Sequence, residues 1–339
     1  LGEVGKGHKV AFCTLNMGRL KLASSSATGA KVALEAASRY AAERVQFGLP
    51  IARFGLIQRK LADMGARAYA AEAVAYRTAG LVYHAIEGLK ATGALTLQDR
   101  LDTLSEFSAE CALAKVYASE AYNELADEAI QVFGGYGFSE EYAPAKLYRD
   151  SRISRIYEGT NEICRLYAQR TLFKKLSASA GEGGSVAKGL DALKKLHAMR
   201  RLAKGKGLRG GATDSLEAVA GLKQVYFVLM EETVTGVGPE KLKHPDFQQF
   251  LASLADVAIE IYAAESAALR VAKLDGTGSA EGQAVNSYVS TVDVSSAGDY
   301  AAMPAWWPAV KSVRTEKLPA ATELTWNKDR HGQEIPFRT

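Results

Sequence analysis

Proline, cysteine and long apolar runs are all scarce in this sequence. Eight prolines in 339 residues leave long alanine-rich stretches without a helix breaker. Three cysteines, Cys13, Cys111 and Cys164, are too few for a disulfide framework and fit a reducing compartment. No run of about 18 apolar residues is present, so no membrane span is predicted. We therefore expect an α-helical, intracellular protein.

Metal-binding motifs and a conventional start are also lacking. The cysteines form no CxxC pair and the five histidines form no HExxH motif, so no zinc site is predicted. The chain opens on Leu1-Gly2-Glu3, without an initiating methionine or a signal peptide. We expect it to be part of a longer protein.

The net charge of +4 is unevenly spread along the chain. Residues 170–209 contain eleven Lys or Arg and two acids, so the remainder sums to −5. Within this segment, a short apolar stripe lies among the basic residues: Val186, Leu190 and Leu193. Such a basic amphipathic pattern suits an anionic membrane surface, so 186–209 predicts peripheral membrane contact. A solvated, mobile linker is the alternative. Without aromatic residues among the basic ones, no nucleic-acid binding is predicted.

Apolar residues recur at spacings of three and four in four long segments, about 14–46, 52–87, 97–133 and 160–176. In the first, nearly all of these residues are alanines, so a neighbouring helix can approach closely. A glycine cluster ends the third, and a connector of about 20 residues follows it. Four long helices with short joins predict an all-α four-helix bundle.

Composition predicts the domain boundaries. We expect a loop at 1–10, a helical bundle at 11–178 and a basic, glycine-rich linker at 179–212. Helical periodicity resumes afterwards and predicts a second helical domain over 213–339. Its tail is expected to be irregular and packed by Trp306 and Trp307.

One carboxylate lies in a setting that suits catalysis. Glu158 stands between Tyr157 and Gly159, just before a helix start with Thr160 as its N-cap. An apolar slot would raise the pKa of this carboxyl and let it act as a general base. The helix N-terminus favours the charged form and so opposes that shift. The alternative is that Glu158 is a surface residue at the start of the helix and has no catalytic role.

Three runs resemble signatures of the acyl-CoA dehydrogenase family: AAERVQFGLPI…IQRKLADM at 41–64, QVFGGYGFSEEYAPAKLYRD at 131–150 and IYEGTNEICR at 156–165. They occur in the family's order and spacing. The resemblance implies a flavoenzyme of fatty-acid β-oxidation that converts acyl-CoA to trans-2-enoyl-CoA. Glu158 would remove the α-proton while a β-hydride passes to FAD. In a minority of relatives the base stands at the position of Gly18, which cannot serve here.

The resemblance also implies FAD contacts. Arg44, Gln46 and Phe47 match a flavin-binding turn that reaches the FAD of a neighbouring subunit; an arginine that offsets a helix dipole is the alternative. Further matching positions are Gln131, Gly134 and Gly135 at the adenosine portion, and Thr160 and Glu162 after the base. The glycines would otherwise form an ordinary helix C-cap.

Substrate contacts follow in the same way. Asn16 and Arg19 match a polar pair near the pantetheine end of CoA, although many relatives carry Asp where Asn16 stands. Tyr157 and Gly159 match residues at the thioester.

The long C-terminal extension is similar to that of very-long-chain members of the family. The domains that precede the bundle in such proteins are absent from this sequence, and 1–10 resembles the end of a β-domain. The resemblance implies a homodimer that passes electrons to electron-transferring flavoprotein. Its expected location is the bacterial cytoplasm or the mitochondrial matrix, with peripheral contact to the inner membrane. An acyl-CoA oxidase-like enzyme and a scaffold protein with secondary catalysis are the alternatives.

Overall fold

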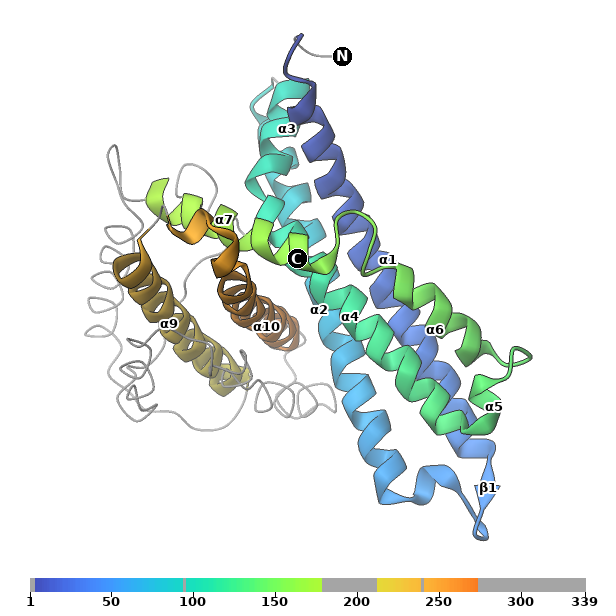
Figure 1. Cartoon of the computed structure of the whole chain (residues 1–339). Helices are drawn as coiled ribbons and strands as arrows, with labels where there is room; N and C mark the ends of the chain where they lie inside the picture. Colours follow the sequence, from blue (N-terminus) through green and yellow to red (C-terminus); the bar gives the residue numbers. More distant parts are fainter. Residues whose placement is uncertain (1–3, 94–95, 179–211, 239–240, 274–339) are drawn as a thin grey trace. The chain divides into compact units, whose positions relative to one another are not determined.

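In the computed structural model, the described part of the chain is predominantly α-helical; it comprises residues 4–93, 96–178, 212–238 and 241–273 (Figure 1). The chain divides into two compact units, one ending at Cys164 and the other beginning at Arg165. This division falls within helix α7 (Asn161–Ala178). The predicted all-α fold is confirmed, whereas the four domain boundaries given above stay predictions.

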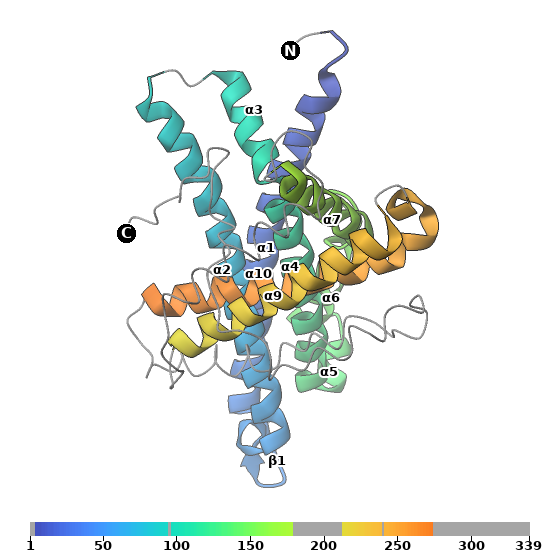
Figure 2. The ribbon, with the colours of Figure 1, turned by 90° about the vertical axis from the view of Figure 1, so that its left-hand side faces the viewer.

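The first unit is built on three long helices: α1 (Gly7–Glu43), α2 (Gly55–Ala91) and α4 (Ser108–Phe133). A short antiparallel hairpin and a 3-10 turn join α1 to α2: β1 (Val45–Gln46), β2 (Leu49–Pro50) and η1 (Ile51–Arg53). Three shorter helices complete the unit: α3 (Leu97–Glu106), α5 (Gly135–Phe138) and α6 (Ala143–Ile153). Figure 2 shows α1, α2 and α4 from a second side.

Small residues bring α1 and α4 close together, as predicted. Ala30, Ala37 and Ala41 of α1 are fully buried in a core shared with Ala126 of α4. The ring of Tyr122 lies directly on the α1 backbone, since a Cβ on Gly29 would be only 2.6 Å from it. This close packing makes α1 and α4 a firm base for the site described below.

Three predictions about the helices are wrong: one start, one helix that is divided in two, and one connector that contains two further helices. The first helix begins at Gly7 rather than near 14, because Cys13 is buried and its thiol donates to Leu101 O of α3 at 3.3 Å. The segment predicted as one helix from 97 to 133 is divided at Phe107, which leaves helical geometry and buries its ring beside Leu20. The connector after Gly134 contains α5 and α6, and α6 packs against α4 and α1.

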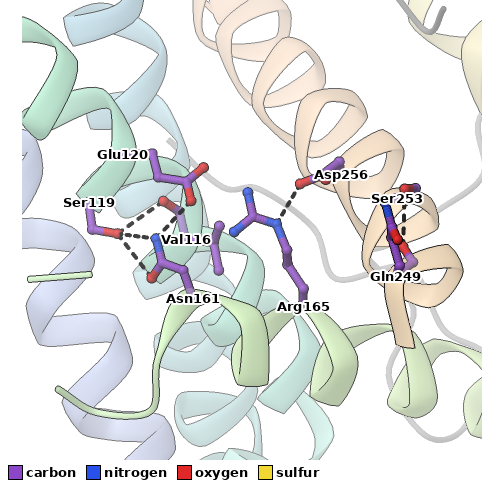
Figure 3. A network of polar contacts seen from close by, with 8 residues as sticks. All are labelled: Val116, Ser119, Glu120, Asn161, Arg165, Gln249, Ser253 and Asp256. Atoms are coloured by element: carbon purple, nitrogen blue, oxygen red, sulfur yellow. Dashed lines mark hydrogen bonds and ion pairs between the residues drawn. The ribbon is translucent and has the colours of Figure 1, made fainter. Parts of the chain in front are cut away.

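The second unit is described by itself. The later part of α7 packs with α9 (Ala212–Val237), α10 (Gln248–Lys273) and the 3-10 turns η2 (Lys241–Lys243) and η3 (Pro245–Phe247). Arg165 Nε donates to Asp256 Oδ1 at 2.6 Å (Figure 3). A buried ion pair joins Lys223 of α9 to Glu265 of α10. Tertiary contacts therefore hold this unit together through both apolar and charged groups.

Some predictions fall on residues that the structure does not describe. The basic segment 186–209 and the tail with Trp306 and Trp307 lie outside the described residues. Among the described helices, none is long and apolar enough to cross a membrane. In the same residues, no group of three or more His, Cys, Asp or Glu side chains could hold a metal ion.

Candidate active site

The turn between α6 and α7 carries Glu158 in an unusual backbone conformation. Glu158 has φ +58° and Gly159 has φ +87°, so two consecutive residues lie in the left-handed region. Glycine accepts this region freely, but for a residue with a Cβ it costs of order 1–3 kcal/mol. Such strain persists only where surrounding contacts over-determine it.

The Glu158 carboxylate lies against the backbone of α1 at Gly18. A Cβ on Gly18 would be 2.5 Å from Oε2 and 2.8 Å from Oε1 of Glu158, closer than real Cβ atoms approach. The carboxylate forms no hydrogen bond or ion pair with any of the described residues, and the side chain is partly exposed. The absence of a side chain at Gly18 therefore makes room for an unpaired carboxylate.

Two predicted substrate residues lie beneath this turn on α1. Arg19 is 3% exposed, and its Nε donates to the backbone oxygen of Glu158 at 3.1 Å. Its Nη1 donates to Asn16 Oδ1 at 3.1 Å, and Asn16 Nδ2 donates to Leu104 O at 3.4 Å. Asn16 thus pairs with Arg19 even though it carries no charge, and Arg19 holds the backbone of the turn.

Lys115 of α4 supports the same turn from another helix. It is fully buried, and its Nζ donates to Gly159 O at 2.9 Å and to Asn161 Oδ1 at 2.5 Å. Burial lowers the pKa of Lys115, and the charges of Cys164, Glu120 and Glu162 oppose this shift.

The nitrogen of the Asn161 amide is also held by residues of α4. Its Nδ2 donates to Ser119 Oγ at 3.1 Å and to Glu120 Oε1 at 2.9 Å, as Figure 3 shows. These acceptors leave its Oδ1 for Lys115 and for the Ser119 hydroxyl, which donates to it at 3.4 Å. Every hydrogen-bonding atom of this buried side chain thereby has a partner.

The remaining residues predicted near the base lie on the same turn or directly after it. Tyr157 is 46% exposed, so in this chain alone it does not exclude water. Thr160 accepts a hydrogen bond from Ile163 N at 3.4 Å, which confirms it as the cap of α7, and Glu162 is exposed in the first helical turn. We call the predicted residues gathered here the base cluster: Asn16, Arg19, Tyr157, Glu158, Gly159, Thr160 and Glu162.

A second group of predicted residues begins at the hairpin between α1 and α2. Phe47 has φ +53° and its side chain is 93% exposed, an uncommon state for a large apolar residue. Gln46 is exposed, and its Nε2 donates to Val45 O at 2.9 Å. The guanidinium carbon of Arg44 lies 5.4 Å from the centre of the Tyr136 ring, a cation–π contact that links the hairpin to α5.

Gln131, Gly134 and Gly135 lie at the end of α4 and the start of α5, and all three are exposed. Gly134 has φ +63° and ψ −141°, a conformation open essentially to glycine alone, so it ends α4 as a cap. We call this group, together with Arg44, Gln46 and Phe47, the hairpin cluster.

The two clusters lie far apart within the first unit. Arg44, the C-cap of α1, stands 25 positions after Arg19, which at 1.5 Å per residue is about 37 Å along the helix. The sequence motifs therefore form two sites on one chain rather than one.

Sequence reasoning missed Lys115, Ser119, Glu120 and Asn161. One signal was available for the lysine, because Lys115 follows Cys111 by four residues on the buried face of α4. A charged residue on an apolar helix face needs polar partners, and these come from the turn at Gly159, far away in sequence.

Comparison with known proteins bears on these sites. Two family models, each described as acyl-CoA dehydrogenase, C-terminal domain, match residues 5–173 and 229–303. A probable acyl-CoA dehydrogenase of Bacillus subtilis is 38% identical over 279 residues, which cover 80% of this chain and 45% of that protein. The very long-chain specific acyl-CoA dehydrogenase of Bos taurus mitochondria is 35% identical over 276 residues, 78% of this chain and 39% of that protein.

A solved structure is similar as well. The Bacillus anthracis acyl-CoA dehydrogenase complexed with FAD matches with a TM-score of 0.72 and 34% sequence identity. The match covers 86% of this chain and 48% of that chain. The chain therefore spans less than half the length of these three relatives.

Proposed function

Since this chain belongs to the acyl-CoA dehydrogenase family, we propose that it supplies the catalytic base of an FAD-dependent enzyme that oxidises acyl-CoA to trans-2-enoyl-CoA. One observation carries this proposal. Glu158 stands in a strained left-handed turn, and its unpaired carboxylate lies against the bare backbone at Gly18.

Glu158 acts as the α-proton base. Its carboxylate has no hydrogen-bond donor among the described residues, so a lone pair is free to take a proton from an acyl chain beside it. The α-proton of a thioester is only weakly acidic, so the base must be held in reach of that carbon while the proton moves. Arg19 and Lys115 hold the two backbone carbonyls of the turn and so limit its movement.

The developing enolate needs a hydrogen-bond donor at the thioester oxygen. No described residue accepts a hydrogen bond from the backbone N–H of Glu158. We assign this N–H to the thioester oxygen, because one residue then supplies both the base and a donor to the charge that proton removal creates. Tyr157 and Gly159 flank the same position, and Asn16 and Arg19 lie on its α1 side.

FAD would supply the hydride acceptor for the β-carbon. The hairpin cluster has groups that fit a flavin dinucleotide. Arg44 offers a guanidinium for the diphosphate, and the exposed Phe47 offers an apolar surface. Gln131, Gly134 and Gly135 lie near them with exposed polar groups and bare backbone. Thr160 and Glu162 would contact FAD beside the base.

The two clusters serve different FAD molecules in this proposal. One dinucleotide is too short to reach from the base cluster to the hairpin cluster, which lie about 37 Å apart along α1. A homodimer removes the difficulty, because the hairpin cluster of one subunit then completes the FAD site of its partner.

Long-chain acyl-CoA is the proposed substrate class, because the similarity to the bovine very long-chain enzyme extends beyond the first unit. The proposal includes a role in fatty-acid β-oxidation, electron transfer to electron-transferring flavoprotein, and a location in the bacterial cytoplasm or mitochondrial matrix. We also propose that residues 186–209 make peripheral contact with a membrane.

Anaerobic addition of acyl-CoA to the FAD-loaded full-length protein tests the proposal. We expect the visible flavin band to bleach, with the fastest reduction by palmitoyl-CoA in a series from butyryl-CoA upward. A flavin that stays oxidised with every chain length would contradict the proposed reaction. Hydrogen peroxide released in air at the rate of turnover would favour the oxidase alternative.

A further inference from the structure

Lys115 is fully buried beside the proposed base, yet the reaction gives it no proton or electron to move. We propose that Lys115 is a positioning residue, whose ammonium holds the turn that presents Glu158 by joining Gly159 O to the Asn161 side chain. This inference rests on the proposed function, because it concerns the same carboxylate.

The partners of Lys115 are the first argument. Both of its hydrogen bonds go to uncharged oxygens, and it forms no salt bridge with any carboxylate of the described residues. A buried ammonium without a directly paired anion costs stability, and burial accordingly lowers the pKa of Lys115. An apolar side chain of the same length would avoid that cost, so fold stability alone does not explain a lysine here.

The backbone of the turn is the second argument. The carbonyls of Glu158 and Gly159 follow one another, and each accepts from a different buried cation. Arg19 holds the first from α1, and Lys115 holds the second from α4. If either hydrogen bond is lost, that carbonyl keeps, among the described residues, only the weak thiol donor of Cys164, at 3.8 Å from Glu158 O and 3.4 Å from Gly159 O. Because the left-handed conformation of Glu158 is disfavoured by itself, the turn then relaxes and moves the carboxylate.

Asn161 is the third argument. Its Nδ2 donates to Ser119 and Glu120 on α4, which fixes its Oδ1 toward Lys115. Lys115 is thereby fixed by the first residue of α7 and by its own helix α4. A rigid ammonium can hold Gly159 O at one place, whereas a mobile one would let the turn move.

The chain offers a matched control in the second unit. Lys223 is 2% exposed and is also a buried lysine, but its partner is the carboxylate of Glu265. Replacing it removes a buried ammonium without touching the turn before α7. Because Lys223→Met also leaves the Glu265 carboxylate without its ammonium, it disturbs the fold at least as much as Lys115→Met does. It therefore reports how the loss of a buried lysine affects the rate when the turn before α7 is untouched.

The test compares Lys115→Met and Lys223→Met in the FAD-loaded full-length protein. In single-turnover flavin reduction by saturating palmitoyl-CoA, we expect Lys115→Met to be slowed roughly 100-fold, the effect of a misplacement of about 1 Å. The KM for acyl-CoA should change less than about threefold, because the proposed role of Lys115 concerns the position of the base during proton removal and not the binding of the substrate. The isotope effect of α-deuterated substrate should rise, since proton removal becomes slower. Lys223→Met should reduce its flavin at the wild-type rate.

Two results would overturn the positioning role. One is a Lys115→Met protein whose flavin is reduced at the wild-type rate with an unchanged isotope effect. If Lys115→Met does not load FAD, Asn161→Ser replaces it as the test, because it keeps the lysine and removes its side-chain partner. We expect Asn161→Ser to be about tenfold slower, as for loss of roughly 1.4 kcal/mol of transition-state stabilisation. A wild-type rate would then overturn the role.

The outcomes also separate this inference from the proposed function. If acyl-CoA never bleaches the wild-type flavin, the proposed function fails and the positioning role fails with it. If the wild type bleaches and Glu158→Gln does not, while Lys115→Met equals wild type, only the positioning role fails.

Discussion

The base cluster lies against the long helix α1 and the hairpin cluster begins just past the end of that helix, yet the two are built in opposite ways. Around Glu158, the supporting side chains are buried and hydrogen-bonded, as Arg19, Lys115 and Asn161 show. At the hairpin, Phe47 and its neighbours Val45 and Gln46 are exposed, and the Phe47 ring meets the Phe54 ring edge-on with 6.2 Å between their centres.

The contrast indicates which part of the site is complete within one chain. A proton acceptor must be held within a fraction of an ångström, so its supporting groups are packed inside the first unit. A surface that binds a large ligand from a partner subunit must instead remain open until that subunit arrives. In the proposed homodimer, apolar side chains such as Phe47, which are exposed in the single chain, would be covered by the partner subunit and its FAD.

The largest effect is expected at Glu158. Glu158→Gln keeps the shape of the side chain and removes its basicity, so single-turnover flavin reduction should fall by about 10²–10⁴-fold. FAD content and the melting temperature should stay near wild-type values, because the carboxylate has no partner among the described residues. Stopped-flow absorbance measures the rate. Retention of more than a tenth of it would show that another group is the base.

A methyl group at Gly18 tests the position of that carboxylate. Its Cβ would lie 2.5 Å from Glu158 Oε2, so Gly18→Ala should displace the base and slow flavin reduction by about 10- to 100-fold. The helix itself should gain about 0.5–1 kcal/mol from the exchange.

Gly65→Ala on α2 is the matched control, because nothing lies within 4 Å of a Cβ there. It should be stabilised in thermal melts without loss of rate. A Gly18→Ala protein as active as Gly65→Ala would show that the carboxylate acts from elsewhere.

At the hairpin cluster, the effect is expected in FAD binding rather than in the rate. Arg44→Ala removes a guanidinium from a partly exposed position, so FAD affinity should fall by about 10- to 100-fold, as for loss of a charged hydrogen bond. Flavin fluorescence during FAD titration measures the affinity. Once saturated, the variant should reduce its flavin at nearly the wild-type rate.

Arg39→Ala serves as the comparison for that measurement. Arg39 is an exposed arginine in the last turns of α1 and pairs with Glu35, so its loss should leave FAD affinity unchanged. Equal affinities for the two variants would remove Arg44 from the proposed FAD site.

The sequence predicts the helices that carry the base cluster better than it predicts the buried side chains that hold the turn at Glu158. Helical periodicity identifies α1 and α2, and the spacing of Glu158 and Thr160 identifies the start of α7. It does not reveal the left-handed φ of Glu158, because that conformation depends on hydrogen bonds from Arg19 and Lys115 across the fold. Local patterns cannot report partners that lie 40 or more residues away.

The same limit explains the errors in the fold. The division at Phe107 and the early start of α1 both depend on tertiary burial, of the Phe107 ring and of Cys13. Helix α6 could have been recognised, since Pro144 stands in its first turn, where proline is favoured.

The central claim is that the two clusters are halves of one active site from different copies of the chain. Subunit complementation tests it most directly, with heterodimers that combine a Glu158→Gln chain and an Arg44→Ala chain. The assay uses an FAD concentration at which the Arg44→Ala homodimer stays empty. If the site is shared, one site carries both changes and the other carries none, so about half of the wild-type activity should return. Heterodimers as inactive as both parent homodimers would contradict the account.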